Sequence, residues 1–263
     1  MDLGLSGKVA LVCASSKGIG KAVAKVLAEE GASVVMCARD GEALSKAREE
    51  VAESGRGEVV AVPCDLTRSV DVDALFREVD RRFGTLHILV NNAGGPPAGT
   101  FLDTNVEMWK EAFELNFLSA FRCTEKALPY MMKEGFGRII NITSFAVKQP
   151  IENLILSNGV RAGLVGMMKT LSREVGEKGI TVNTICPGYI LTKRLESVLE
   201  KRAAASGLSR EEAFEMALSE VPAGRFGKPE EIGYVVAFLA SEKAAYVNGV
   251  TLQVDGGLIR SLL

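Results

Sequence analysis

A glycine-rich segment near the start of the chain has the residue types of an anion-binding loop. The stretch CASSKGIG covers residues 13–20, follows an apolar run and leads into a segment of helical spacing. Gly18 and Gly20 allow the backbone to approach a ligand closely, and the free N–H groups at a helix start suit a pyrophosphate. A strand-to-helix turn without a ligand uses such glycines as well. We predict that the loop binds a dinucleotide through Ser15, Ser16, Lys17, Gly18, Ile19 and Gly20.

The other reactive residue types exclude several classes of site. With a single histidine, His87, a multi-histidine metal site is nearly excluded, and we predict no metal. The five cysteines form no C-x-x-C pair and lie mostly in apolar stretches, as expected of reduced core thiols in a cytoplasmic protein. The net charge of −2 excludes the basic footprint of a nucleic-acid binder. No apolar run approaches the roughly 20 residues that span a bilayer, so we expect no membrane partner.

Hydrophobic periodicity predicts the elements that must position these residues. Short β-rich runs alternate with segments of helical spacing, which implies parallel strands joined by right-handed crossovers. Runs that are apolar throughout predict strands covered by helices on both faces. We therefore predict an α/β protein, with a Rossmann-type doubly wound seven-stranded parallel sheet in a single domain, 1–263. The predicted strands are 8–13, 33–38, 58–64, 86–91, 138–143, 181–186 and 250–254.

One connection is unusually long for such a fold. Residues 193–221 follow the sixth predicted strand and carry two segments of helical pattern. Long connections in compact domains are often lids or binding loops. A surface helical hairpin is the alternative, and the sequence leaves both open; we take a helical lid on the substrate side as the prediction.

Motifs along nearly the whole chain resemble those of the short-chain dehydrogenase/reductase family. The family's loop T-G-x-x-x-G-x-G is matched over 13–20, except that Cys13 replaces the threonine and Ala14 the first glycine. An alanine there is costly only if the turn needs a positive φ. The family's N-N-A-G stands at 91–94, and segments 187–192, 246–249 and 254–257 also match. The resemblance implies further cofactor contacts from Asp65, Leu66, Asn92, Ala93, Gly94, Pro187, Gly188, Ile190 and Thr192.

Some of these matches have purely structural alternatives. Asp65 also suits a cap of the turn that follows it, and Asn91 with Asn92 also suits the end of a strand. His87 stands where the family often has an aspartate, and we interpret it as a structural residue at the start of a strand.

Two cations favour NADP(H) over NAD(H). An NAD site places a carboxylate after its second strand to accept the ribose hydroxyls, but this chain has Ala38 followed by Arg39. The guanidinium fork of Arg39 and the ammonium of Lys17 both suit a 2′-phosphate. Asp40 is the local objection, because it is placed either to engage the ribose or to pair with Arg39.

The resemblance also implies a catalytic group, which is incomplete here. In the family a Tyr donates a proton, a Lys lowers its pKa and holds the nicotinamide ribose, a Ser holds the carbonyl oxygen, and an Asn supports a water relay. Ser144 and Asn116 match the serine and the asparagine. The positions expected for the tyrosine and the lysine hold Ser157 and Arg161. We expect Arg161, on the same helical face as Ser157, to clamp the ribose hydroxyls.

The loss of the tyrosine has a large chemical consequence. A serine hydroxyl is a far weaker acid than a phenol, and its side chain is too short to occupy the place of the phenol. General acid catalysis contributes roughly 10²–10⁴-fold, so activity would be slow rather than absent. Three explanations stay open. Tyr189 or Lys148 supplies the proton, a water held by Ser157 and Asn116 supplies it, or the protein binds NADP(H) without turnover.

The resemblance leads to one expected function with alternatives. We expect an NADP(H)-dependent oxidoreductase similar to 3-oxoacyl-acyl-carrier-protein reductases, which transfers a hydride between nicotinamide and a small-molecule carbonyl or alcohol. The alternative from another class is a silent NADP(H)-binding protein that acts as a sensor or partner subunit. A third alternative is a lyase or isomerase that uses the same pocket without net redox change. The family also implies a homotetramer, joined through its long helices and last strand.

Overall fold

The fold is built on one parallel sheet. The computed structural model describes residues 2–262, apart from the side chain of residue 205. Seven strands pair in parallel in the order β3-β2-β1-β4-β5-β6-β7, which is the doubly wound arrangement of a Rossmann-type sheet. The strands agree with the predicted runs to within two residues at each end. They are β1 (Val9–Val12), β2 (Ser33–Ala38), β3 (Val59–Pro63), β4 (Ile88–Asn91), β5 (Gly137–Ile142), β6 (Ile180–Pro187) and β7 (Thr251–Val254).

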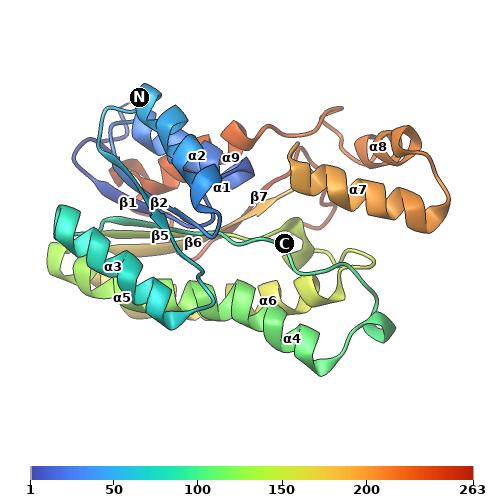
Figure 1. Ribbon diagram of the computed structural model, residues 1–263, viewed down its shortest axis with the longest axis horizontal. Helices are drawn as coiled ribbons and strands as arrows, with labels where there is room; N and C mark the ends of the chain where they lie inside the picture. Colours follow the sequence, from blue (N-terminus) through green and yellow to red (C-terminus); the bar gives the residue numbers. More distant parts are fainter. Residues whose placement is uncertain (1, 263) are drawn as a thin grey trace.

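Helices cover both faces of this sheet (Figure 1). One face carries α1 (Gly18–Glu29), α2 (Gly41–Ser54) and α9 (Pro229–Ala240). The other carries α3 (Ser69–Phe83), α5 (Ser119–Glu134) and α6 (Ile155–Val175), with α4 (Val106–Phe113) at its end. Short helical turns complete the chain, and they are η1 (Phe101–Asp103), η2 (Glu114–Leu118), η3 (Phe145–Val147), η4 (Gly176–Lys178) and η5 (Glu242–Ala244). The predicted doubly wound α/β fold is confirmed.

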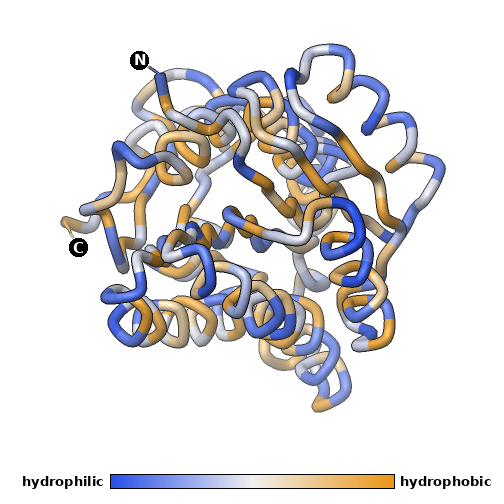
Figure 2. Tube along the Cα trace, turned by 90° about the vertical axis from the view of Figure 1, so that its left-hand side faces the viewer, coloured by the Kyte–Doolittle hydropathy of each residue, from blue (hydrophilic) through white to orange (hydrophobic). Residues whose placement is uncertain are grey.

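Two apolar layers hold the sheet between the helices. Leu27 of α1 packs with Met36 of β2 in one layer, and Leu75 of α3 packs with Ile139 of β5 in the other. Figure 2 shows hydrophobic segments in the interior, while the helices alternate between hydrophobic and hydrophilic turns. This alternation is the amphipathic pattern of helices that bury one side. The strands are apolar on both sides because both faces are covered.

The residues that sequence analysis excluded from chemistry have structural roles. All five cysteines are free and buried. His87 Nδ1 accepts a hydrogen bond from the Val9 N–H at 3.0 Å, and burial lowers the pKa of His87. The imidazole is therefore a structural acceptor directly before the start of β4. Within residues 2–262 there is no cluster of side chains suited to a metal ion. No helix in that range is long and apolar enough to cross a membrane.

The long connection after β6 forms two helices, as its pattern predicts. They are α7 (Lys193–Ser206) and α8 (Arg210–Ser219). Leu195, Leu199 and Ala217 pack with Tyr189 and with aromatic rings of α8 and the segment beyond it. This small apolar cluster holds the helical pair beside the carboxyl ends of the strands, where Figure 1 shows it projecting from the sheet.

Candidate active site

The predicted phosphate loop turns tightly between β1 and α1. A Cβ at Gly20 would lie 2.3 Å from the Ala14 carbonyl oxygen, so this position admits only glycine. The first N–H groups of α1 have no partner inside the helix and face the end of the sheet, as an anion site requires. A Cβ at Gly18 would lie 3.5 Å from Thr192 Cγ2, and this proximity brings the loop against the segment that follows β6.

Ala14 adopts the conformation that the family's glycine would adopt at no cost. Its φ is +48°, in the left-handed region. We expect Ala14→Gly to raise the free energy of unfolding by about 1 kcal/mol, because the Cβ of an L-residue is strained there. Urea unfolding at pH 7 measures the effect. Ala22→Gly is the control, since Ala22 lies inside α1 and a glycine there should lower stability by about 1 kcal/mol. A loss of stability in Ala14→Gly would show that the turn carries no strain.

Ser15, one of the predicted cofactor contacts, makes its hydrogen bonds within the protein. Its side chain is fully buried, its hydroxyl donates to the Val12 carbonyl at 2.9 Å, and the same oxygen accepts the Cys37 N–H at 3.0 Å. Its own N–H donates to the Cys37 carbonyl at 3.0 Å. Ser15 therefore ties β1 to β2 and supports the loop from below, with no donor left to face a phosphate.

The end of β2 leaves Arg39 available to a ligand. Asp40 Oδ1 accepts the Ala43 N–H at 3.0 Å and so caps α2, which answers the objection that Asp40 would pair with Arg39. Arg39 is exposed, and within residues 2–262 it makes no ion pair. Lys17, at the start of α1, is exposed as well.

Asp65, which follows β3, caps the turn after it, as its structural interpretation predicts. Its Oδ1 accepts the Thr67 N–H at 3.0 Å and the Thr67 hydroxyl at 2.8 Å. Partial burial acts to raise the pKa of Asp65, but the two bonds from Thr67 and the nearby Arg39 hold it below its usual value. The carboxylate is thus ionised at neutral pH and orders the loop after β3.

The N-N-A-G segment after β4 joins the phosphate loop to the catalytic positions. Asn92 Nδ2 donates to the carbonyls of Cys13 and Ala14 at 3.3 and 3.4 Å. The Gly94 carbonyl accepts from Asn116 Nδ2 at 2.8 Å, and space around the Gly94 Cα is open. Across the cleft, Thr192 Oγ1 accepts the Leu195 N–H and caps α7. Gly188 packs against Asp255 too closely to admit a Cβ, and Ile190 is buried beneath this segment.

The four predicted catalytic positions meet at the carboxyl ends of β4 and β5. Ser144 lies two residues after the end of β5, and its hydroxyl oxygen accepts the Ala146 N–H at 3.1 Å. Asn116 lies in the π-helical turn η2, and its Oδ1 is buried with no hydrogen-bond partner in the described chain. Ser157 is 8% exposed and lies one turn before Arg161 on α6. Such a π turn is frequent where a helix must present a functional side chain.

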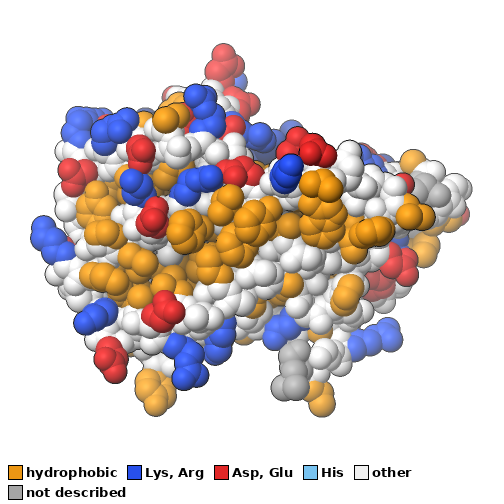
Figure 3. All heavy atoms as spheres, turned by 90° about the horizontal axis from the view of Figure 1, so that it is seen from below, with side chains coloured by type: hydrophobic (Ala, Val, Ile, Leu, Met, Phe, Trp, Pro, Cys, Tyr) orange, Lys and Arg blue, Asp and Glu red, His pale blue; other side chains and the backbone are white. Residues whose placement is uncertain are grey.

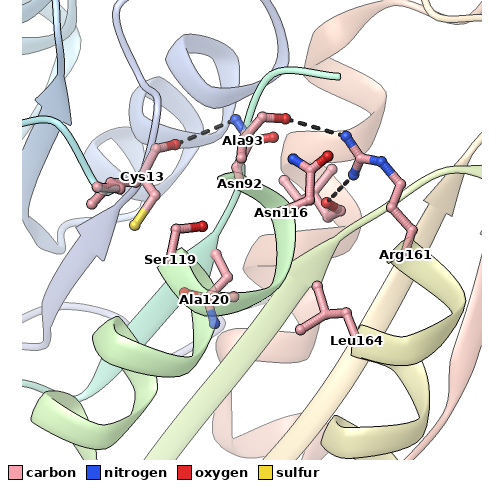
Figure 4. A pocket seen from close by; sticks show the side chains of 11 residues that line it. Cys13, Asn92, Ala93, Asn116, Ser119, Ala120, Arg161 and Leu164 are labelled. Carbon is pink, nitrogen blue, oxygen red and sulfur yellow. Dashed lines mark hydrogen bonds between the residues drawn. The ribbon is translucent and has the colours of Figure 1, made fainter. Parts of the chain in front are cut away.

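Arg161 is the most unusual group of the site. It is 6% exposed, and its guanidinium donates to the carbonyls of Ile142, Thr143 and Ala93 at 3.2–3.4 Å (Figure 4). Burial lowers the pKa of Arg161 to about 10, and the charge of Arg194 acts in the same direction. No carboxylate of residues 2–262 forms an ion pair with Arg161. The guanidinium of Arg161, which we expect to hold the ribose hydroxyls, therefore donates some of its N–H groups to backbone carbonyls instead.

A small cavity lies beside Arg161 and Asn116. Its volume is about 10 Å³, close to the minimum that one water molecule needs, and its lining supplies polar groups. Figure 4 shows both side chains at its edge, together with Asn92 and Ala93. The lining residues are Cys13, Leu66, Asn91, Asn92, Ala93, Asn116, Ser119, Ala120, Ile142, Arg161 and Leu164.

Tyr189 is poorly suited to replace the missing acid. Its hydroxyl lies 3.1 Å from Glu220 Oε2, and its ring packs edge-on against Phe145 and Phe226. Burial, with the nearby Glu220 carboxylate, raises the pKa of Tyr189 to about 12. The Tyr189 phenol is thus a weaker acid than an unperturbed tyrosine side chain. Its hydroxyl points to Glu220, directly after α8. Lys148, the other candidate, follows η3 and is half-buried.

Sequence analysis missed one residue of the site, Arg194. From the first turn of α7 its Nη2 reaches the Pro96 carbonyl at 3.0 Å, on the loop after β4. A Cβ at Gly95 would lie 2.8 Å from the same nitrogen. An arginine in a helical segment gives no sequence signal for such a contact, because the two residues lie 98 positions apart.

Comparisons with known proteins show which family the chain is similar to. The family profile described as Enoyl-(Acyl carrier protein) reductase matches residues 13–259. The 3-oxoacyl-acyl-carrier-protein reductase of Vibrio cholerae is 37% identical over 256 residues, which cover 97% of this chain and 99% of that protein. The D-beta-hydroxybutyrate dehydrogenase of Cupriavidus necator is 35% identical over 257 residues, covering 97% and 99%. The crystal structure of L-sorbose reductase from Gluconobacter frateurii, complexed with NADPH and L-sorbose, has a TM-score of 0.94 at 36% identity and full coverage of both chains. The chain belongs to the short-chain dehydrogenase/reductase family.

Proposed function

We propose that the chain is an NADP(H)-dependent oxidoreductase that acts on a small-molecule carbonyl or alcohol. The observation that carries the proposal is the meeting of a phosphate loop, the N-N-A-G segment and Ser144 at one edge of the sheet. Bound nicotinamide would supply or accept the hydride. Relatives named as reductases and dehydrogenases, one of them solved with NADPH, support the oxidoreductase over the silent binding protein.

The residues present fit the cofactor. The free N–H groups of Gly18, Ile19 and Gly20 would hold the pyrophosphate, and Ser16, Lys17 and Thr192 border the same groove. Arg39 and Lys17 would hold the 2′-phosphate, and Leu66 with Asp65, after β3, would contact the adenine. Ala93, Gly94, Pro187, Gly188 and Ile190 would line the nicotinamide end, where the open space at Gly94 leaves room for a ring.

The chain's own groups suggest how a proton reaches the carbonyl oxygen. Ser144 would orient that oxygen by donating its hydroxyl proton. A water in the small cavity would find a donor in Arg161 and an acceptor in the unpartnered Asn116 Oδ1. We propose that water held in this way, between Arg161 and Asn116, replaces the missing phenol as the proton source. This path is slower, because water is a weaker acid than a tuned phenol.

We expect NADPH to bind at least ten times more tightly than NADH. The reason is the interaction of Arg39 and Lys17 with the 2′-phosphate, and Arg39→Ala should remove most of this preference. Titration of cofactor fluorescence measures both affinities. Arg56→Ala is the matched control, because Arg56 is exposed beyond the C-terminal end of α2, whereas Arg39 precedes its start, and the change should leave both affinities unchanged. Equal affinities in the wild type would contradict the NADP(H) assignment.

The reaction itself is tested by following NADPH absorbance with ketones, diketones and 3-oxoesters. We expect slow but measurable consumption of NADPH, and a lower rate in Ser144→Ala, because Ser144 orients the carbonyl oxygen. Tight NADPH binding without turnover of any carbonyl would instead support the silent binding protein.

We also propose a cytoplasmic homotetramer. Phe113, Phe121 and Met132 are exposed around α5, and Figure 3 shows hydrophobic side chains gathered in a band over the face that carries α5 and α6. At the β7 edge of the sheet, Tyr246 and Leu252 are exposed as well. Exposed apolar bands of this kind mark protein interfaces. We expect light scattering to give the mass of four chains, and Phe121→Glu to give smaller species; a monomeric wild type would contradict this arrangement.

A further inference from the structure

Two arginines reach the same short loop from opposite sides of the cleft. Arg161, from α6 below the cleft, donates to the Ala93 carbonyl at 3.4 Å. Arg194, from α7 above it, donates to the Pro96 carbonyl at 3.0 Å. Three residues of extended chain span roughly 10 Å at most, so the two carbonyls that these guanidinium groups contact lie close together on the loop that contains Gly94. The charge of Arg194 also lowers the pKa of Arg161, as expected of two cations that lie near each other. Space around the Gly94 Cα is open.

Neither arginine is neutralised by a carboxylate of the part of the chain that the structure describes. Within residues 2–262 no carboxylate forms an ion pair with either, although other arginines of the chain, such as Arg225 with Glu231, do have carboxylate partners. Burial lowers the pKa of Arg161. It also lowers the pKa of Arg194, although much of the Arg194 side chain is exposed. A desolvated charge without a counterion is costly, and an anion placed between the two would relieve that cost.

The hydrogen bonds of Arg161 leave it able to bind such an anion. At 3.2–3.4 Å its three bonds to carbonyls are longer than the usual 2.9–3.0 Å, and five N–H groups are available on a guanidinium. Guanidinium groups match carboxylate and phosphate oxygens with two parallel bonds.

We propose that Arg161 and Arg194 form an oxyanion subsite that binds the carboxylate of an oxo-acid substrate. The inference rests on the proposed function, since it names the substrate class of the same site. The pyrophosphate of the cofactor has the same chemistry, but α1 already offers that group its free N–H donors. Arg161 lies one turn from Ser157, where the substrate carbonyl would react, and this position assigns the subsite to the substrate.

The experiment compares charged and neutral ligands by calorimetric titration, without relying on turnover. The protein saturated with NADP⁺ is titrated with 3-oxobutanoate and with its methyl ester. We expect the acid to bind at least tenfold more tightly than the ester. Arg194→Met should reduce this preference below threefold, and Arg194→Lys should keep part of it. Lys201→Met is the control, because Lys201 is an exposed cation on the same helix, α7, and should change nothing.

A second variant tests the geometry without removing an arginine. The Cβ of Gly95→Ala would displace the end of the Arg194 side chain, which is flexible enough to move without unfolding the loop. We expect this variant, too, to lose most of the preference for the acid.

The possible outcomes separate the sources of the anion. Loss of the preference in Arg194→Met and Gly95→Ala, with unchanged NADPH affinity, supports the substrate subsite. Weaker NADPH binding in these variants, with the acid preference intact, overturns the assignment to the substrate in favour of the cofactor pyrophosphate. Equal binding of acid and ester by the wild type overturns the subsite altogether. If NADP⁺ does not bind, the proposed function fails, and the same comparison on the free protein still tests the subsite.

Discussion

Ser157→Tyr combined with Arg161→Lys is expected to raise the rate of NADPH-dependent ketone reduction by roughly tenfold or more. The two positions lie one turn apart on α6, and both are buried toward Ser144 and Asn116 at the ends of β4 and β5. A phenol at 157 would reach the cleft that the serine is too short to reach. The lysine ammonium would lower the pKa of that phenol and restore a tuned general acid.

Single variants divide this effect into its parts. Ser157→Tyr alone should gain less, because the Arg161 guanidinium is bulkier than an ammonium and is held by three carbonyls next to the new ring. Steady-state kinetics with activated ketones and diketones gives kcat and KM for each variant. A brisk wild type and a slower double variant would show that another group supplies the proton, and Lys148→Met and Tyr189→Phe would then identify it. The high pKa of Tyr189 makes Lys148 the first to test.

Arg161→Met is expected to raise the free energy of unfolding of the ligand-free protein by about 2 kcal/mol, while it weakens ligand binding. Replacing a buried charge that lacks a counterion by an apolar side chain of similar length removes its desolvation cost. The carbonyls of Ile142, Thr143 and Ala93 lose a donor, which reduces the gain. Urea unfolding at pH 7 measures the difference.

The pH dependence follows from the direction of the shift. The folded-state pKa of Arg161, about 10, lies below the usual value, so the folded protein carries the full penalty at every pH well below 10. The penalty is relieved only as the pH rises through 10 toward the unfolded value. The advantage of Arg161→Met should therefore be constant between pH 6 and 8.

Arg138 provides a matched control, since it is also a buried arginine that donates to backbone carbonyls. Its guanidinium stacks on the Phe136 ring at 4.1 Å, and Glu242 acts on it with an opposite charge. We expect Arg138→Met to lower stability, because it removes favourable contacts together with the charge. If Arg161→Met also proves destabilising, the carbonyl bonds outweigh the desolvation of Arg161, and an anion is not needed to balance it.

The sequence by itself determined the elements and the chemical classes of residue along the cleft. Runs such as 33–38 are apolar throughout, so a strand buried on both faces is the structure that satisfies them. The glycines at 18 and 20 marked the phosphate loop, because backbone geometry is encoded locally. The motif positions also placed Ser144, Asn116, Ser157 and Arg161 at strand ends and on helices, where the structure has them.

Only the tertiary structure decided how these side chains are used. Asp40 caps α2, the Ser15 hydroxyl makes hydrogen bonds to β1 and β2, and the Tyr189 hydroxyl bonds Glu220. The bonds of Arg161 to Ala93 and of Arg194 to Pro96 join residues 68 and 98 positions apart. No local pattern encodes such pairings, because they depend on which strands become neighbours and on how much water the packed helices leave around each charge. The strain of Ala14 and the unneutralised charge of Arg161 arise in the same way, from constraints that exist only when the sheet is assembled.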